Sequence, residues 1–427
     1  MIKKRFTRRS RTNFNFVFYI LIILIIAFIV VFVVNKFGSD VNNTNDEQIL
    51  KEINTHYSEY IIVNNDSPIY VLENNKYVKK GVVHKDAILK LKNINITKNT
   101  KYFVIDNFDR DYYIDYKLVS PTESIIEKND RYSRYIPFNE NIIGDNIDLY
   151  RNDNLVLTLN ENISLPIYIK DNDIYYVEYA DDLYSVKKED VSVVSSNNTD
   201  KKNISKIGVL NYHFFWNDET EKNSECDQVI CHSKTQFKQQ LDYIKDNDIL
   251  TLKMEELEMW IDGKLQLPKS VVITIDDGYR MDLGIQMLEE YKLNGTVFLI
   301  TSWFDDTSFI NDYKYVEFHS HGEKLHTAGA CPGGQGGGIK CLSEDKLLED
   351  LATSRKKLNN TTIFCYPFYE FNDYSISVLK KAGFTMAFAG ESSYKDNHVT
   401  VGSDKYRLPR FVVVNYTTMS DFANFVG

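Results

Sequence analysis

The chain has 427 residues, of which 43% are hydrophobic and 26% are charged. This composition excludes a wholly disordered, collagenous or coiled-coil protein, and the length predicts two or three domains. Acidic residues outnumber basic residues by 60 to 50, which gives a formal net charge of −10. The first 34 residues hold six basic side chains and no acid, so the remainder is more acidic still. We expect no nucleic-acid partner, because phosphate contacts need clustered Lys and Arg.

The N-terminus carries an uncharged run of nineteen residues, 16–34. At a helical rise of ~1.5 Å per residue, this run crosses most of a hydrocarbon core of ~30 Å. The basic cluster precedes the run and only Lys36 follows closely, which places the N-terminus in the cytoplasm. A cleaved signal peptide is the alternative, but the run is long and no Ala-x-Ala site follows it. We predict a single-pass protein of the cell membrane with an extracytoplasmic catalytic domain, beginning with a cytoplasmic basic tail (1–15), a transmembrane signal anchor (16–34) and a stalk (35–63).

The cysteines fit an extracytoplasmic location. Cys226 and Cys231 are near neighbours, and Cys331 and Cys341 bracket a Gly-rich segment. Two local disulfides need the least reorganisation of the chain, with a zinc knuckle or free thiols as alternatives. Cys365 lies in an apolar run, where a buried, inert thiol is expected.

Two segments, 64–123 and 145–194, alternate short apolar runs with clusters of Asn, Asp and Lys, which is the pattern of small all-β units. Residues 112–116 (Tyr-Tyr-Ile-Asp-Tyr) are echoed by 175–179 (Tyr-Tyr-Val-Glu-Tyr), a weak internal repeat. Both segments resemble bacterial SH3-like modules in pattern, without a diagnostic motif. We expect their tyrosines to pack within the strands, with stacking on wall sugars as the alternative. Residues 195–202 are small or polar and predict a linker.

Beyond residue 204, buried apolar runs alternate with helical patterns, which predicts a parallel sheet closed or nearly closed into a barrel. The predicted fold class is therefore α/β: a distorted (β/α) barrel catalytic domain over 204–427, preceded by two small all-β (SH3-like) modules and one transmembrane helix. The predicted strands of the barrel are 207–210, 271–275, 297–300, 315–318 and 362–366, and the predicted helices are 235–246, 280–291, 343–358 and 374–382.

Two predicted strand ends carry residues suited to metal chemistry. Asp276 and Asp277 follow one buried run directly, and the carboxyl ends of barrel strands are where active sites form. A simple Asp-Gly turn is the alternative. Another strand end is followed by His319, His321 and His326 within eight residues. Imidazoles beside a carboxylate bind zinc or a similar ion, so we expect one divalent metal, with zinc as the first choice.

These residues stand in segments that resemble the motifs of the polysaccharide deacetylases, carbohydrate esterase family four. The first motif is Thr-Ile-Asp-Asp-Gly at 274–278, and the second is Ser-His-Gly at 320–322 continuing to His326. A third, Phe-Cys-Tyr-Pro-Phe, follows at 364–368. The resemblance covers 204–427 and is specific, because all three motifs occur in order. The wider gap between the two histidines is similar to that of exported poly-N-acetylglucosamine deacetylases.

By position, the resemblance implies a role for each residue. Asp276 becomes the catalytic base, and Asp277, His321 and His326 become the metal ligands. The implied oxyanion and substrate residues are Phe368, through its backbone N–H, Tyr366 and Arg410.

Three features depart from the family pattern. Many members have an arginine where Cys365 stands, and Arg410 is expected to pair with the base instead. Tyr369 replaces the usual glycine after the third motif. The C-terminal Leu-x-x-His that usually supplies the catalytic acid is missing, and His398 lies in a polar context without that motif.

The catalytic acid is instead assigned to His213. The predicted strand 207–210 runs into Asn-Tyr-His, and this Leu-x-Tyr-His resembles the reordered motif of poly-N-acetylglucosamine deacetylases. The first and last strands of a barrel are neighbours, so either can deliver a side chain to the same rim position. A histidine merely packed at a strand end is the alternative.

Together these features predict metal-dependent hydrolysis of N-acetyl groups from N-acetylglucosamine residues of peptidoglycan, with release of acetate. A membrane-anchored enzyme works close to the wall, so a cell-wall glycan is the expected substrate. One alternative is an exopolysaccharide, poly-N-acetylglucosamine, and another is an inactive wall-binding protein. A metalloprotease or nuclease is disfavoured because neither His-Glu-x-x-His nor a second metal cluster is present. The sequence leaves the oligomeric state open.

Overall fold

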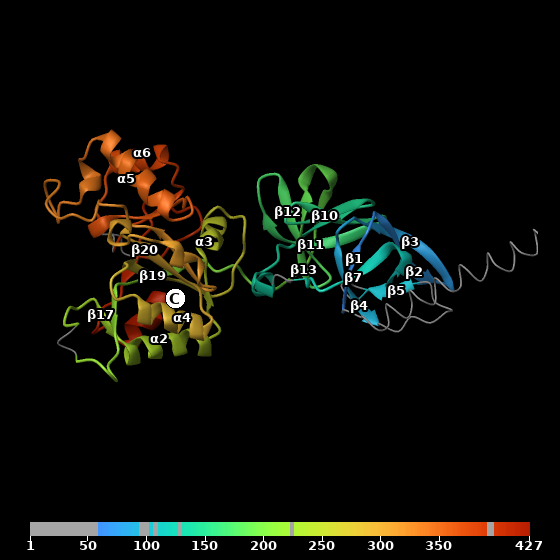
Figure 1. Cartoon of the computed structure of the whole chain (residues 1–427), viewed down its shortest axis with the longest axis horizontal. Helices are drawn as coiled ribbons and strands as arrows, with labels where there is room; N and C mark the ends of the chain where they lie inside the picture. Colours follow the sequence, from blue (N-terminus) through green and yellow to red (C-terminus); the bar gives the residue numbers. More distant parts are fainter. Residues whose placement is uncertain (1–58, 94–101, 106–109, 127–129, 223–225, 391–396) are drawn as a thin grey trace, which may run out of the picture. The chain divides into compact units, whose positions relative to one another are not determined.

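The chain forms two compact units, which the computed structural model shows in Figure 1. The first unit contains the chain up to Lys128 together with Asp145–Asn162 and Tyr179–Asp181. The second contains Asn129–Gly144, Ile163–Glu178 and Asp182–Gly427. The structure describes residues 59–93, 102–105, 110–126, 130–222, 226–390 and 397–427.

The first unit is an antiparallel sheet with one buried face. Its strands alternate buried and partly exposed positions, as in β5 and β6, because successive side chains of a strand point to opposite faces. Two of its hairpins turn at residues with positive φ, Asn74 and Asn75 in one and Asn152 and Asp153 in the other, which Asn and Asp tolerate. The strand order is β9-β10-β3-β2-β6-β5-β4-β1-β7, with β1 Tyr60–Val63, β2 Ser67–Glu73, β3 Lys76–Val83, β4 Ile88–Asn93, β5 Tyr102–Ile105, β6 Tyr112–Asp115, β7 Val119–Thr122, β9 Ile147–Arg151 and β10 Asn154–Leu159; the 3₁₀ helix η1 is Tyr116–Leu118.

This arrangement corrects the prediction of two self-contained SH3-like modules. Strand β10 comes from the second predicted segment but pairs with β3 of the first, with Leu157 opposite Val83 and Leu159 opposite Gly81. The pairing provides hydrogen-bond partners for backbone groups on the outer edge of β3. It also buries Leu157 and Leu159 completely. The SH3-like resemblance is not confirmed.

The second unit begins with another antiparallel group of strands. Their order is β14-β8-β11-β12-β13. Ile136 donates a backbone hydrogen bond to Gln266, and Ile169 forms a bridge with Leu265, so this group packs against the rest of its unit. The elements are β8 Glu140–Gly144, β11 Ile163–Lys170, β12 Ile174–Tyr179, β13 Asp182–Lys187 and β14 Ser192–Ser195, with 3₁₀ helices η2 Asp130–Arg134 and η3 Lys188–Asp190.

A parallel half-barrel forms the rest of the second unit. The strand order is β23-β22-β21-β20-β19-β15-β24, and β18 also pairs with β19. The two ends are not joined by a strand ladder, but Leu408, just before β24, exchanges backbone hydrogen bonds with Ala387 and Ala389 beside β23. The strands are β15 Gly208–Tyr212, β18 Leu250–Thr251, β19 Ser270–Asp277, β20 Gly295–Leu299, β21 Val316–Ser320, β22 Ile363–Cys365, β23 Met386–Phe388 and β24 Phe411–Val412, and the separate pair β16 Phe214–Trp216 and β17 Cys231–Ser233 lies beside them.

Helices cover the half-barrel because each crossover between parallel strands packs an apolar stripe on the sheet. In Figure 1, α2 and α4 lie together on one side of β19 and β20, while α5 and α6 lie together on the other. Every residue of β15, β19 and β20 is buried, which fits apolar runs covered on both faces. The helices are α2 Lys234–Asp246, α3 Met254–Ile261, α4 Asp282–Tyr291, α5 Glu344–Lys357, α6 Asp373–Lys381 and α7 Met419–Val426, with short η5 Thr301–Trp303, η6 Ser308–Asn311, η7 Gly338–Lys340 and η8 Pro367–Tyr369.

The predicted transmembrane helix needs correction. No helix in the part of the chain that the structure describes is long and apolar enough to cross a membrane. The segment 16–34, on which the prediction rested, lies outside the described residues. The predictions of fold class and of a single-pass membrane location that included this helix are therefore withdrawn.

Candidate active site

The candidate site forms where three parallel strands end. Asp276 and Asp277 are the last two residues of β19, His213 follows β15, and His321 follows β21. Strand β15 pairs directly with β19, and β20 pairs with both β19 and β21. Because parallel strands end at the same edge of a sheet, residues far apart in sequence converge there.

The histidine and aspartate ligand types gather in one cluster. The Oδ1 atom of Asp277 lies 3.4 Å from Nε2 of His321 and 3.4 Å from Nε2 of His326. That oxygen is buried and accepts no hydrogen bond from the described residues. The Nδ1–H of His321 donates to the carbonyl oxygen of Cys365 at 2.8 Å, which leaves Nε2 to face the aspartate. A buried, unsatisfied carboxylate oxygen between two imidazoles fits a divalent cation of the zinc type.

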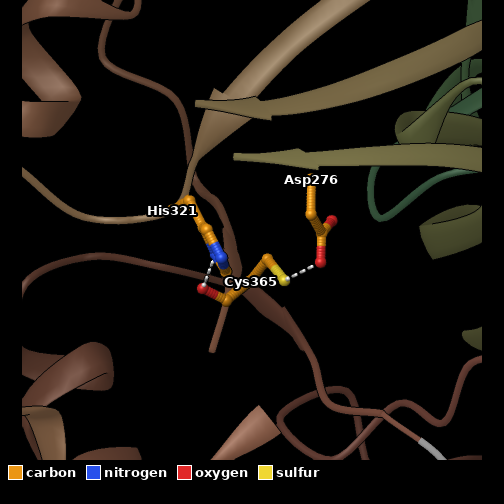
Figure 2. Close-up of side chains that lie close together, drawn as sticks. All are labelled: Asp276, His321 and Cys365. Atoms are coloured by element: carbon orange, nitrogen blue, oxygen red, sulfur yellow. Dashed lines mark hydrogen bonds between the residues drawn. The ribbon is translucent and has the colours of Figure 1, made fainter. Parts of the chain in front are cut away.

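A second cluster of potential ligands lies beside the first. Figure 2 shows Asp276, His321 and Cys365, with the Cys365 thiol directed at Asp276 Oδ2 at 3.5 Å. This set is less suited to a metal. Burial raises the pKa of the Cys365 thiol, so the ligating thiolate is disfavoured. The carboxylate of Asp276 is already bonded on both oxygens to Arg410.

The pair between Asp276 and Arg410 is fully buried. Arg410 Nη1 donates to Asp276 Oδ1 at 2.7 Å, and Nη2 donates to Oδ2 at 2.8 Å. Its Nε–H donates to the Ala389 carbonyl at 2.7 Å, and Nη1 also reaches Thr274 Oγ1 at 3.1 Å. Burial alone would raise the pKa of Asp276, but the charge and hydrogen bonds of Arg410 hold it far below its usual range. The carboxyl group is therefore ionised at any working pH.

His213 lies at the same edge of the sheet and is 9% exposed. Its Nε2 is 3.4 Å from the hydroxyl oxygen of Tyr369, while its Nδ1 is buried and without a hydrogen-bond partner among the described residues. Burial lowers the pKa of His213, and the carboxylates of Asp276 and Asp277 only partly offset this. A protonated His213 therefore releases its proton more readily than an exposed histidine.

The segment that carries His326 is held from outside the site. Both carboxylate oxygens of Asp350, on α5, accept backbone hydrogen bonds, from Glu323 at 2.8 Å and from Lys324 at 2.7 Å. The ring of Phe368 packs on His326 with centroids 4.2 Å apart. Helix α5 and the third motif thus fix the position of the second histidine.

The remaining predicted residues divide into two groups. Phe368 lies at the site, whereas the Tyr366 side chain is fully buried in the core and its hydroxyl donates to the Tyr406 carbonyl at 3.0 Å. His319 also lies apart from the ligand cluster, hydrogen-bonded to Thr361 Oγ1 at 2.6 Å. The structure therefore does not bring Tyr366 or His319 to the reacting groups.

The predicted local disulfides are confirmed. Cys226 is bonded to Cys231 and Cys331 to Cys341. The loop closed by the second bond is built around Glu370, whose carboxylate accepts backbone N–H groups of Gln335 at 2.6 Å and Gly337 at 2.7 Å.

Residues 264–387 match the family model described as polysaccharide deacetylase. This part of the chain is a polysaccharide deacetylase domain. The poly-beta-1,6-N-acetyl-D-glucosamine N-deacetylase of Staphylococcus aureus strain MSSA476 is 27% identical over 285 residues, covering 61% of this chain and 91% of that protein. The putative polysaccharide deacetylase YxkH of Bacillus subtilis is 24% identical over 193 residues, covering 40% of this chain and 67% of that protein. Among solved structures, IcaB from Ammonifex degensii has 20% identity and a TM-score of 0.44, covering 52% of this chain and 98% of that chain.

Two residues of the candidate site were not found from the sequence. Asn211 and Tyr369 are hydrogen-bonded to each other at 2.7 Å across 158 positions of the chain. Tyr369 was seen only as a departure from the family pattern, and Asn211 only as a neighbour of His213. A polar side chain in the middle of an otherwise apolar strand was the available signal, because such a group needs a buried partner.

Proposed function

We propose that this chain is a metal-dependent deacetylase of poly-N-acetylglucosamine, an exopolysaccharide, and that it releases acetate and leaves glucosamine residues. The choice of substrate is supported by the similarity to the Staphylococcus aureus enzyme, which extends over 91% of that protein. Peptidoglycan becomes the second choice, because the similar Staphylococcus aureus protein is a poly-beta-1,6-N-acetyl-D-glucosamine N-deacetylase.

The geometry favours an active enzyme over an inactive wall-binding protein. Tyr369, which replaces the usual glycine after the third motif, packs the centre of its ring 5.5 Å from the guanidinium carbon of Arg410, the arginine that binds Asp276. Asp277 keeps a buried oxygen that a structural carboxylate would satisfy with a hydrogen bond. A scaffold has no need of either arrangement.

Asp277, His321 and His326 would hold the metal. A divalent cation bound there would polarise the N-acetyl carbonyl and make water a better nucleophile. Asp276 acts as the base: its ionised carboxylate accepts the proton of the attacking water, and Arg410 keeps it in one orientation.

The leaving amine needs a proton, and His213 supplies it. Its lowered pKa makes the protonated imidazole a ready donor to nitrogen. The backbone N–H of Phe368, next to His326, stabilises the developing oxyanion.

Acetate release tests the proposal directly. The full chain, loaded with zinc, is incubated separately with poly-β-1,6-N-acetylglucosamine and with peptidoglycan. We expect acetate from the first polymer, loss of activity with a chelator and recovery with zinc. His319→Ala serves as the control that keeps activity, because His319 lies apart from the ligands. Acetate from peptidoglycan alone would restore the wall polymer as substrate, and full activity after complete metal removal would contradict the metal-dependent chemistry.

A further inference from the structure

The side chain of Tyr369 lies between the proposed acid and the proposed base. Its hydroxyl donates to Asn211 Oδ1 at 2.7 Å and lies 3.4 Å from Nε2 of His213. The face of its ring is 5.5 Å from the guanidinium carbon of Arg410, which holds Asp276. One side chain therefore contacts both halves of the reaction centre.

The hydrogen-bond pattern determines which group is the donor and which is the acceptor between Tyr369 and His213. A phenol has one proton, and the short bond to Asn211 uses it. Asn211 is oriented for this role, because its amide Nδ2 donates to the Tyr212 carbonyl at 3.2 Å and so turns Oδ1 toward the phenol. Toward His213 the phenol oxygen can then only accept. The proton of the neutral imidazole consequently sits on Nε2, the nitrogen that faces the phenol oxygen.

The chain accepts a conformational cost to place this ring. Phe368 and Tyr369 both adopt left-handed backbone angles, with φ of 58° and 61°. Such angles cost of the order of 1–3 kcal/mol for residues other than glycine, and they persist mainly at functional sites. Gly390 makes room for the ring, since a Cβ there would lie 2.5 Å from a Tyr369 ring carbon.

We propose that Tyr369 is the positioning residue for His213, holding the imidazole so that Nε2–H is the proton delivered to the leaving amine. In that step the amide C–N bond breaks and its electron pair stays on nitrogen. The proton of the imidazolium Nε2–H moves to that nitrogen, so His213 becomes neutral and glucosamine leaves as the amine. This inference rests on the proposed function, because it assumes that His213 is the acid.

A double-mutant cycle between Tyr369→Phe and His213→Gln tests it. Tyr369→Phe removes one oxygen and keeps the ring, and acetate release is followed on a soluble β-1,6-linked N-acetylglucosamine pentamer. We expect kcat to fall about tenfold with KM unchanged, a fraction of the ~10²- to 10⁴-fold that general acid help is worth. In the His213→Gln background the same change should cost nothing, because the residue it positions is gone.

Tyr406→Phe is the matched control. It also removes a hydroxyl from a partly buried tyrosine of the same unit, one that donates to the Phe384 carbonyl at 2.7 Å. Its effect should be small and equal in both backgrounds. Zinc content and circular dichroism should be unchanged in every variant. If Tyr369→Phe is poorly folded, Asn211→Leu breaks the same arrangement from the other side and enters the cycle in its place.

Two results distinguish a failure of the positioning role from a failure of the proposed deacetylase activity. An equal loss of kcat from Tyr369→Phe with and without His213 would overturn the positioning role while leaving the deacetylase intact. A wild-type enzyme that releases no acetate from the pentamer would instead remove the proposed function.

Discussion

The buried ion pair between Asp276 and Arg410 dominates the chemistry at the residue scale. Neither side chain is exposed to solvent by more than 2%, and two parallel hydrogen bonds join them. A buried pair of this kind contributes little net stability, but removing one partner leaves an uncompensated charge that costs about 3–5 kcal/mol. Its value here lies in keeping Asp276 ionised and in one orientation.

Replacing the arginine should reverse the pH behaviour of the base. In Arg410→Met the burial of Asp276 remains but the cation is gone, so its pKa should rise above the usual value. The acid limb of the kcat/KM profile then moves toward neutral pH. Zinc-loaded enzyme assayed between pH 4 and 8 measures the shift, and an unmoved acid limb would contradict this account of the base.

Arg410→Met should also change how the free energy of unfolding depends on pH. In the wild type the depressed pKa of Asp276 adds stability above about pH 4, which is lost as the pH falls toward the folded-state pKa. In Arg410→Met the raised pKa of Asp276 has the opposite effect. The protonated carboxyl then stabilises the folded state at acid pH, and this stabilisation is lost as the pH rises. Urea unfolding should therefore show a gap between the two proteins that widens from pH 3 to pH 7. Arg407→Met, at a surface ion pair with Asp373, should change stability by less than about 1 kcal/mol.

The ligand set makes a separate prediction about metal content. His321→Ala and His326→Ala should each reduce bound zinc from about one ion per chain to near zero, because both imidazoles face the unsatisfied oxygen of Asp277. His319→Ala should retain the ion, since its ring bonds to Thr361. Elemental analysis of the purified proteins measures this. Loss of zinc from the His319 variant with retention in the His321 variant would show that the site lies elsewhere.

At the scale of elements, α5 supports the proposed metal site through the segment that follows β21. Asp350→Ala removes the acceptor of two backbone N–H groups, those of Glu323 and Lys324, and so loosens the chain between the two histidines. We expect zinc affinity to fall about 10- to 100-fold, as for other residues that orient metal ligands. Competition with a chromophoric chelator gives the affinity. Glu349→Ala, exposed on the same helix, is the control, and an equal loss in both variants would mean that α5 itself had been disturbed.

The predictions for the second unit rested mostly on short, local sequence patterns. The apolar run 271–275 is followed by two carboxylates and lies within β19, and the histidine cluster begins with His319 inside β21 and continues directly after it. Each signal occupies a few consecutive residues, so it can be read without knowing the fold. The disulfides were readable for the same reason, since their partners are 5 and 10 positions apart.

Contacts between distant segments were beyond that kind of inference. The alternation of β10 predicts a strand but not its neighbour, because many alternating strands have edges that would accept it. Its pairing with β3, about 75 residues away, therefore broke the predicted module boundary. The hydrogen bond between Asn211 and Tyr369 was missed for the same reason, since the sequence around either residue does not indicate its partner.

At the scale of the whole molecule, metal binding should couple to unfolding. A ligand that binds only the folded state at 100 times its Kd adds about 2.7 kcal/mol, which for a domain of this size raises Tm by roughly 5–10 °C. Thermal unfolding of the chelator-treated chain, with and without added zinc, measures the rise. Asp277→Asn should show almost none, and a full rise in that variant would point to zinc binding at another place.

The order in which the site is assembled along the chain has a consequence for damaged or incomplete molecules. The proposed metal ligands all lie between Asp277 and His326. The proposed acid, His213, precedes them directly after β15, and Arg410, which pairs with the proposed base, follows them just before β24. A molecule cut between β23 and β24 with loss of its last segment keeps every ligand but loses that arginine. Such a fragment would capture zinc without hydrolysing glycan, so metal content would overestimate the amount of working enzyme in a proteolysed preparation, and only turnover would report the intact chain.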